Sequence, residues 1–263
     1  MTAWLDGDWL EADAAGPSIR DRGFLLGDGL FETLCHKHGR LHRAEAHLAR
    51  LRVSCLSLGL ACPLEDHDWQ GIIGELMARQ GLASAAIRIT VTAGTGERGL
   101  ARAASPSASC LITVAALAAP PASLTLATSD IRRAASSFAA RHKTLSYIDN
   151  VMARRQAQAA GADMALLLDT DGHLSGADCA NVFWMSGGAY FTPSLDCAVL
   201  PGTVRAALLD GLGVTEGRFS PDRLFTADQV FLTNALMGAV PVVSLDGEAL
   251  PACLPDAVTR VLA

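Results

Sequence analysis

Apolar and polar positions follow two different periods along the chain, and these predict both helices and strands. Residues 45–60 and 66–80 repeat apolar side chains at spacings of three and four, which line one face of a helix. Residues 85–92 and 109–115 are rich in β-branched and apolar side chains, as strands are. A short run at 4–10 predicts a hairpin. The first half is therefore expected to be mixed α+β.

The second half of the chain changes more often between the two patterns. The predicted strands lie at 123–128, 163–168, 180–185, 189–192, 214–219, 229–233 and 240–245, and the predicted helices lie at 149–160, 202–212 and 254–262. Strands this short and this close together favour a mostly antiparallel or barrel-like sheet over a doubly wound one.

A candidate domain boundary lies near the middle of the chain. Two adjacent prolines, Pro120 and Pro121, follow an apolar strand-like run and favour an extended connector. We expect an N-terminal α+β domain (1–117), a linker (118–122) and a C-terminal domain (123–263).

Composition is typical of a soluble protein and excludes several kinds of partner. Of the 263 residues, 50% are hydrophobic and 18% are charged, which suits one large or two modest cores. The net charge is -6 and no basic stripe is present, so nucleic acid is not an expected partner. The longest apolar run, 111–119, is about half a membrane span, and no export signal precedes it. Neither membrane insertion nor export is expected.

The spacing of the cysteines and histidines predicts neither a disulfide framework nor a metal site. Seven cysteines are scattered without a C-x-x-C pair, which is typical of reduced thiols in the core and of a cytoplasmic location. His36, His38 and His42 are spaced like metal ligands, but no carboxylate accompanies them and His38 lies at an expected hairpin tip. We therefore expect no metal site.

Lysine is scarce in this chain. Only Lys37 and Lys143 are lysines among the 21 basic residues, so arginine supplies almost all of the positive charge. A lysine can lose its proton and act as a nucleophilic amine, which a guanidinium cannot do. The scarcity alone leaves open whether either lysine is functional or simply lies on the surface.

Three segments carry groups that suit a phosphate or a carboxylate. Residues 201–209 open a helix directly after Pro-Gly, which leaves free amides at the positive end of the helix dipole. Arg50 lies beside an apolar helical stripe, where its guanidinium can offer two donors. The glycine-rich loop 94–99 contains Arg98. Each segment by itself is also compatible with an ordinary turn or a solvated helix.

Together these segments resemble the fold-type IV enzymes that use pyridoxal 5'-phosphate, the class IV aminotransferases. The resemblance follows the family order along nearly the whole chain, through DRGFLLGDGLFET (21–33), HLARL (47–51), GTGERGL (94–100), HKTLSYIDN (142–150), GADMALLLDTDG (161–172), NVFW (181–184), LPGTVR (200–205) and NALMGAVPV (234–242).

The resemblance implies a two-domain α+β fold with a barrel-like C-terminal domain, a homodimer, and pyridoxal phosphate in the cleft between the domains. It implies that Lys143 forms a Schiff base with the cofactor and then moves protons. The implied phosphate contacts are Arg50 and the 202–204 turn (Gly202, Thr203 and Val204), with Asn234 and Ala235. Phe31, Glu32 and Arg98 would face a small amino substrate, and Arg98 would bind its carboxylate.

One position departs from the family pattern. Relatives usually place a glutamate five residues before the asparagine of the Asn-x-Phe strand, where it keeps the pyridine nitrogen protonated, but this chain has Gly176 there. Loss of that carboxylate weakens the electron sink of the ring. Asp178 is two residues further on and would share a face with position 176 in an extended segment, so we consider it as a substitute.

The reactions of the family diverge after the lysine chemistry that they share. One branch is a lyase that eliminates pyruvate from 4-amino-4-deoxychorismate and leaves 4-aminobenzoate, a folate precursor. The run 234–242 and the Arg-Gly-Leu sequence at 98–100 resemble the lyase, whereas Glu32 after Phe31 is more typical of transaminases. We expect the lyase, with a transaminase of D-amino acids or amines as the alternative.

Two further points stay open at this stage. The glycine at position 176 also fits a catalytically inactive relative that keeps the fold and binds a phosphorylated ligand. Tyr147, four residues after Lys143, either touches the edge of the cofactor ring or packs in the core.

Overall fold

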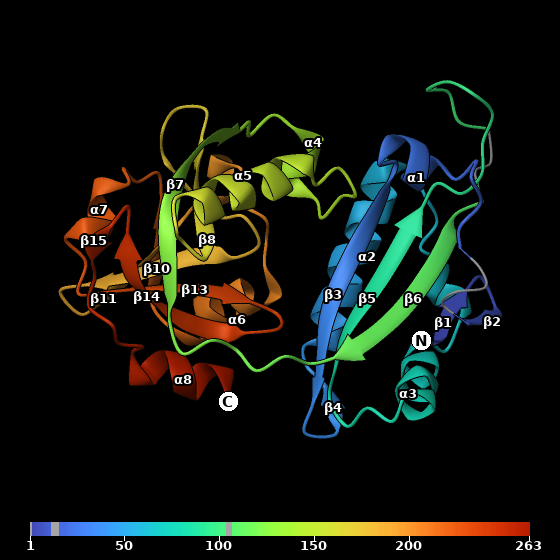
Figure 1. The fold of residues 1–263 in the computed structure, drawn as a ribbon, viewed down its shortest axis with the longest axis horizontal. Coiled ribbons are helices and arrows are strands. Elements are labelled where there is room, and N and C mark those ends of the chain that lie inside the picture. Colours follow the sequence, from blue (N-terminus) through green and yellow to red (C-terminus); the bar gives the residue numbers. More distant parts are fainter. Residues whose placement is uncertain (1, 12–15, 104–106) are drawn as a thin grey trace. The chain divides into compact units, whose positions relative to one another are not determined.

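The computed structural model describes residues 2–11, 16–103 and 107–263. Their contacts divide the chain into two units (Figure 1): unit 1 comprises Met1–Ala118 and His142–Ser146, and unit 2 comprises Ala119–Arg141 and Tyr147–Ala263. The lysine segment thus belongs to unit 1, although the sequence prediction counted it with the C-terminal domain.

Unit 1 is an antiparallel sheet with helices packed against it. Its elements are β1 (Thr2–Leu5), β2 (Asp8–Glu11), α1 (Arg22–Leu26), β3 (Gly29–Lys37), β4 (Arg40–Leu41), α2 (Ala44–Leu58), the 3-10 turn η1 (Pro63–Asp66), α3 (Trp69–Arg79), β5 (Ala85–Thr92) and β6 (Ser109–Ala116). The strand order is β2-β1-β6-β5-β3-β4, and each neighbouring pair is antiparallel.

The core of unit 1 lies between this sheet and the helices α2 and α3. Leu51 of α2 and Leu76 of α3 pack with Ile87 of β5 and Ile112 of β6, and all four side chains are buried. Helix α2 ends at Leu58 because the following glycine adopts a left-handed conformation, with φ of 71°.

Unit 2 contains a mixed sheet of nine strands. Its elements are β7 (Leu124–Arg133), α4 (Phe138–Arg141), α5 (Ile148–Ala159), β8 (Met164–Asp169), β9 (Leu174–Ala177), β10 (Asn181–Ser186), β11 (Ala189–Pro193), the 3-10 turn η2 (Leu195–Cys197), α6 (Thr203–Gly211), β12 (Val214–Gly217), α7 (Asp222–Phe225), β13 (Gln229–Asn234), β14 (Gly238–Leu245), β15 (Glu248–Ala249) and α8 (Asp256–Leu262). The main order is β12-β11-β10-β13-β14-β7-β8-β9, and β15 pairs with β14.

The sheet of unit 2 curls into a half-barrel (Figure 1). Strand pairs β11/β12, β14/β7 and β7/β8 are parallel, and the other pairs are antiparallel. Leu126 and Leu166 from one side of the order pack in the same core as Val182 and Leu232 from the other side, which requires a curled sheet. This agrees with the barrel-like sheet expected from the short strands.

Two expectations from composition can be compared with the structure. All seven cysteines carry free thiols. Five of them are buried as predicted, but Cys179 and Cys253 are exposed, so the prediction that all seven lie in the core was wrong for these two. Within the ranges that the structure describes, no helix has the length and apolar character needed to span a bilayer.

Candidate active-site residues

Lys143 is held against β3 by backbone hydrogen bonds. The amide of Phe31 donates to the carbonyl of Lys143 at 2.8 Å, and the amide of Leu145 donates to the carbonyl of Gly29 at 2.9 Å. These bonds extend the sheet of unit 1 by a short stretch of chain that comes from more than 100 residues downstream. The segment that carries Lys143 is therefore tied to the sheet of unit 1 by backbone hydrogen bonds.

The Lys143 side chain is half-buried and lies over an aromatic ring. Its Nζ atom is 4.1 Å from the centroid of the Phe31 ring. The Cζ atom of Arg88 is 3.8 Å from the same centroid. A ring face attracts cationic groups, so Phe31 contributes to the placement of both side chains.

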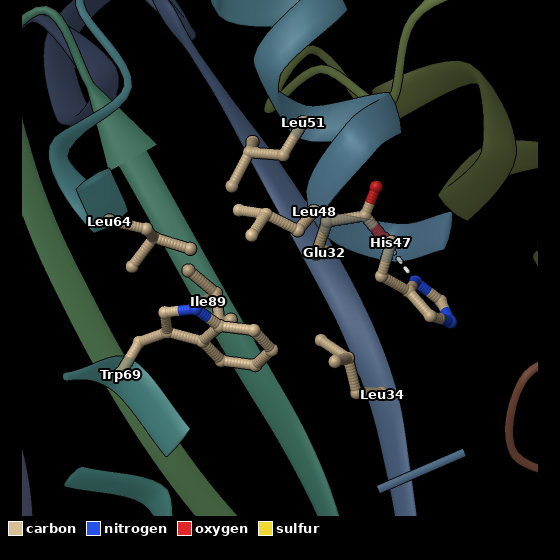
Figure 2. Close-up of a pocket in the computed structure, with 8 residues that line it drawn as sticks. All are labelled: Glu32, Leu34, His47, Leu48, Leu51, Leu64, Trp69 and Ile89. Atoms are coloured by element: carbon tan, nitrogen blue, oxygen red, sulfur yellow. Dashed lines mark hydrogen bonds and ion pairs between the residues drawn. The ribbon is translucent and has the colours of Figure 1, made fainter. Parts of the chain in front are cut away.

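Phe31 and Glu32 point to opposite faces of β3, because successive side chains of a strand alternate. Figure 2 shows Glu32 on the side that faces α2, beside a pocket that it lines with His47, Leu48 and Trp69. That pocket has no room for a water molecule, so it belongs to the core. Only Phe31 of the pair lies on the Lys143 side of the sheet, and the expectation that both residues face substrate does not fit this geometry.

Glu32 instead organises two basic side chains of α2. Its carboxylate accepts a hydrogen bond from Nδ1 of His47 at 2.7 Å and two from Arg50, at 2.7 Å from Nε and 2.6 Å from Nη2. Burial of Glu32 raises the pKa of its carboxyl, but the hydrogen bonds from His47 and Arg50 outweigh burial and lower the pKa to about 2. The pair with Arg50 is bidentate, which orients the guanidinium that the sequence assigned to phosphate.

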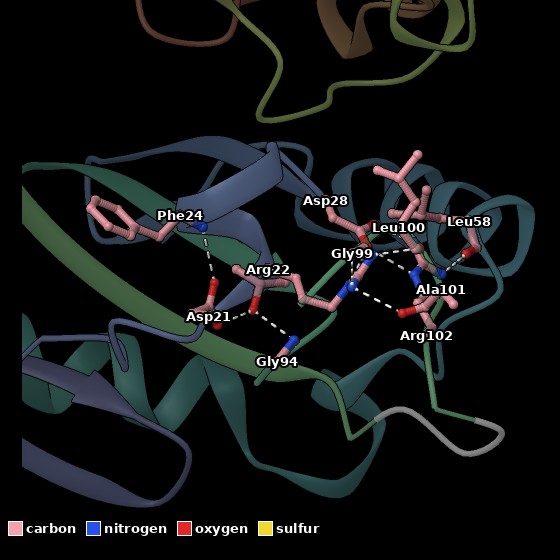
Figure 3. A network of polar contacts seen from close by, with 11 residues as sticks. Asp21, Arg22, Phe24, Asp28, Leu58, Gly94, Gly99, Leu100, Ala101 and Arg102 are labelled. Carbon is pink, nitrogen blue, oxygen red and sulfur yellow. Dashed lines mark hydrogen bonds and ion pairs between the residues drawn. The ribbon is translucent and has the colours of Figure 1, made fainter. Parts of the chain in front are cut away.

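The loop that carries Arg98 is fixed by a buried arginine (Figure 3). Arg22 donates hydrogen bonds to three consecutive carbonyls of the loop, those of Gly99 (3.1 Å), Leu100 (2.9 Å) and Ala101 (3.2 Å). It also forms an ion pair with Asp28 at 2.8 Å. A guanidinium is suited to this task because its donors form a rigid fork.

Asp28 joins that arginine to a second one, Arg102, through another ion pair. Burial raises the pKa of the Asp28 carboxyl, but hydrogen bonds from Arg102 and Arg22 have the larger combined effect and lower it below its ordinary value. Arg98 itself is exposed and lines a surface pocket of about 490 Å³ together with Arg20 and Arg22. The lining also includes Glu97, which forms an ion pair with Arg20, so the pocket carries three arginines against one carboxylate.

In unit 2, α6 begins without a side-chain cap. Gly202 is its N-cap, and Thr203 and Val204 are its first two residues, both buried. A Cβ atom at position 202 would lie 2.1 Å from Oδ1 of Asn181, so only glycine fits this close approach. The amides at the start of this nine-residue helix have the chemistry that phosphate requires.

The other two residues assigned to the phosphate lie where β13 ends: Asn234 is its last residue, and Ala235 begins the turn to β14. Oδ1 of Asn234 accepts hydrogen bonds from the amides of Leu236 (3.0 Å) and Met237 (2.9 Å). The Asn234 side chain therefore shapes the turn, and Ala235 lies within it.

Tyr147 is half-buried and is the residue that precedes α5.

Asp178 is buried and its carboxylate is fully engaged. It accepts hydrogen bonds from Arg154, at 2.7 Å from Nε and 2.5 Å from Nη2, and from the amide of Ala165 at 2.8 Å. These bonds connect α5 to β8. The side chain is thus committed to holding that helix on the sheet, and its geometry gives no support to a role in place of the missing carboxylate at Gly176.

Sequence reasoning did not identify several residues that organise these groups. Arg22 and Asp28 lie inside the family-like segment 21–33, which was the one available signal for them. His47 lies on the same helix face as Arg50, one turn away, but nothing in the sequence pairs either residue with Glu32.

Comparison with known proteins supports the resemblance. Residues 29–245 match the model of the family described as amino-transferase class IV. A protein of Methanocaldococcus jannaschii named "Putative branched-chain-amino-acid aminotransferase" is 30% identical, over 95% of this chain and 90% of its own length. Aminodeoxychorismate lyase of Bacillus subtilis is 25% identical, over 92% of this chain and 86% of its own.

A solved structure agrees with these matches. The "Putative 4-amino-4-deoxychorismate lyase" of Legionella pneumophila superimposes with a TM-score of 0.88 and 29% identity, covering 95% of this chain and 96% of that one. The family depends on pyridoxal 5'-phosphate, and its members are lyases or transaminases. The fold-type IV architecture, the cofactor and the enzyme class expected from the sequence are thereby confirmed. The chain belongs to the class IV aminotransferase family.

Proposed function

We propose that this enzyme is a lyase that converts 4-amino-4-deoxychorismate to 4-aminobenzoate and pyruvate. The single observation that supports the proposal most strongly is the backbone-anchored Lys143 in a chain whose local sequence at 98–100 and 234–242 resembles the lyase. Two of the three relatives described above are named as such lyases, and the third is named as an aminotransferase.

The residues present fit pyridoxal phosphate. Lys143 supplies a primary amine from a segment whose backbone is hydrogen-bonded to β3. Helix α6 begins at Gly202 without a side-chain cap, and the glycine allows the close approach of Asn181. We assign the covalent link to Lys143 and the phosphate to Arg50, with the amides of Gly202, Thr203 and Val204. Asn234 and Ala235 are assigned to the same phosphate through their turn.

The chemistry needs few groups from the protein. When bound, pyridoxal phosphate supplies a carbonyl carbon that takes up amines and a ring that withdraws electrons from the bond being broken. Lys143, freed when the substrate amine takes its place on the cofactor, would remove the proton from the substrate carbon that bears the amino group. The C–O bond would break, and the departing enolpyruvate would take up a proton to become pyruvate. Arg98 binds a substrate carboxylate, and Phe31 contributes to the placement of the lysine amine.

A transaminase of D-amino acids or amines is the second candidate, which the aminotransferase name of one relative favours. The sequence feature that favoured it was Glu32 after Phe31. Because the Glu32 carboxylate is bound to His47 and Arg50, its presence is explained by the positioning of Arg50 and does not argue for a transaminase substrate.

The two candidates differ in their need for a second substrate. Elimination from 4-amino-4-deoxychorismate needs no second substrate, whereas transamination requires a keto acid that accepts the amino group. We expect the cofactor-loaded protein to form equal amounts of pyruvate and 4-aminobenzoate from 4-amino-4-deoxychorismate alone. Glutamate formation from D-alanine and 2-oxoglutarate, with no 4-aminobenzoate in the first assay, would refute the lyase. We also propose that the protein is a homodimer and that it lies in the cytoplasm. Sedimentation of the loaded protein would test the homodimer.

A further inference from the structure

An arginine approaches the glycine that replaces the family glutamate. Gly176 lies on β9, and Arg133 is the last residue of β7, on the other side of β8. A Cβ atom at position 176 would lie 3.7 Å from Nη1 of Arg133 and 3.0 Å from the carbonyl oxygen of Ala180. Nη2 of Arg133 donates a hydrogen bond to the carbonyl of Ala177 at 3.1 Å. The guanidinium of Arg133 therefore lies next to the position that the Cβ atom of a side chain at 176 would take.

The strand registers explain why the two residues meet. Gly176 pairs with Leu167 of β8, and Arg133 pairs with Asp169, two residues further along the same strand. Positions two apart on a strand share a face, so the Arg133 side chain lies on the Gly176 side of the sheet. Leu167 packs against Ala153 of α5, which identifies this face as the one that α5 covers.

Within the described part of the chain Arg133 has no direct carboxylate partner, although Asp178 and Asp149 lie near enough to favour its protonated form. The carboxylate of Asp178 is bound to Arg154. Burial lowers the pKa of the Arg133 guanidinium, but arginine stays protonated at any ordinary pH and can only donate hydrogen bonds. A partly buried cation with a single carbonyl partner is a strong donor for a further acceptor.

We propose that Arg133 donates a hydrogen bond to the pyridine nitrogen of the cofactor, which therefore stays unprotonated. The inference rests on the proposed function, because only bound pyridoxal phosphate presents that nitrogen. A glutamate in the usual position would keep the nitrogen protonated, whereas a guanidinium donates a hydrogen bond to the nitrogen without transferring its proton at neutral pH. Arg133 thus contacts the cofactor and places a positive charge where the family usually has the negative charge of a glutamate.

The reversal has a consequence for the reaction. An unprotonated pyridine ring withdraws electron density less strongly than a protonated one, so it stabilises negative charge on the substrate carbon less well. Elimination that yields 4-aminobenzoate gains the stability of an aromatic product, and transamination has no such gain. The arginine therefore favours the lyase of the two candidate reactions.

The test is the protonation state of the ring nitrogen, read directly by NMR. The protein is loaded with pyridoxal phosphate carrying ¹⁵N in the ring, and the chemical shift is compared with those of protonated and unprotonated reference compounds. We expect an unprotonated, hydrogen-bonded shift in the unaltered protein. Arg133→Leu should move it to the shift of a nitrogen without a hydrogen bond, and Arg133→Lys, which restores a cationic donor, should move it part of the way back.

Two further variants complete the test. Arg132→Gln is the matched control, because Arg132 is the exposed neighbour on the opposite face of β7, and its shift should equal that of the unaltered protein. Gly176→Glu combined with Arg133→Leu should give a protonated shift. Circular dichroism establishes that each variant is folded.

The outcomes separate the two claims. A protonated nitrogen in the unaltered protein, or a shift that does not respond to Arg133→Leu, would overturn the role of Arg133 while leaving cofactor binding intact. Absence of any bound cofactor, seen as no change in visible absorption on adding pyridoxal phosphate, would overturn the proposed function and this inference together.

Discussion

The carboxylate of Glu32 holds the guanidinium of Arg50 in a bidentate ion pair, with Nη2 at 2.6 Å from Oε2 and Nε at 2.7 Å from Oε1. The pair connects β3, which carries the contact to Lys143, with α2, which carries the proposed phosphate ligand. Glu32 is therefore a positioning residue, and it acts on the cofactor through Arg50.

Glu32→Gln should weaken cofactor binding. The amide keeps the shape of the side chain but loses the charge that orients Arg50, and a hydrogen bond to a charged group contributes about 1.5–3 kcal/mol. We expect the Kd for pyridoxal phosphate to rise roughly tenfold. Titration of the apoprotein, followed by absorbance, measures the Kd. Glu75→Gln removes an exposed pair with Arg79 and serves as the control, which should bind normally. Equal Kd values for both variants would contradict the positioning role.

The same carboxylate should make stability depend on pH. The pKa of Glu32 is lowered from 4.5 to about 2 in the folded protein, so its stabilising contribution is complete above the unfolded value and is lost as pH falls toward 2. The shift corresponds to ~3 kcal/mol. The difference in unfolding free energy between the unaltered protein and Glu32→Gln should therefore shrink as pH is lowered through this window. Urea unfolding at a series of pH values measures it, and a difference that stays constant with pH would be inconsistent with the lowered pKa.

Asp178→Asn should damage stability more than cofactor binding. Breaking a buried ion pair leaves Arg154 without its partner, which costs about 3 kcal/mol. We expect a lower unfolding free energy and a normal absorption band for the bound cofactor. Asp171→Asn changes an exposed carboxylate in the turn between β8 and β9 and should alter neither quantity. Loss of the band with unchanged stability would instead restore Asp178 as a partner of the ring nitrogen.

Arg22→Lys should impair the loop that carries Arg98. The lysine keeps the charge beside Asp28 but cannot donate to the carbonyls of Gly99, Leu100 and Ala101 in the same way. Because the loop positions the proposed carboxylate ligand, we expect KM to rise roughly tenfold with a smaller change in kcat. Arg79→Lys, at an exposed pair with Glu75 on α3, is the control. If both variants had the same KM as the unaltered enzyme, Arg22 would not support substrate binding.

Periodic elements were predictable from the sequence to within a few residues. The strand expected at 85–92 is β5 with the same bounds. The helix expected at 45–60 is α2, which ends at Leu58, two residues early, because Gly59 follows. The pattern failed where an element is too short to show a period. Strand β9 was missed because Leu174–Ala177 is buried at every position and shows no alternation.

The candidate residues were found through motifs, but their contacts were not. Whether Glu32 meets substrate or Arg50 depends on which face of β3 packs against α2, and that is set by the tertiary fold. The membership of Lys143 in unit 1 depends on hydrogen bonds to Phe31, 112 positions earlier in the printed sequence. The approach of Arg133 to Gly176 likewise requires the order β7-β8-β9, which no local pattern encodes.

The central claim is that Lys143 binds the cofactor, and the chain offers an internal control because its only other lysine, Lys37, is exposed on β3. Borohydride reduction of the loaded protein makes the link permanent, and mass spectrometry of the peptides locates it. We predict one phosphopyridoxyl group on Lys143, none on Lys37, and loss of the label in Lys143→Arg, because a guanidinium cannot form the bond. A label on Lys37, or a fully loaded protein in which Lys143 remains unlabelled, would contradict the account.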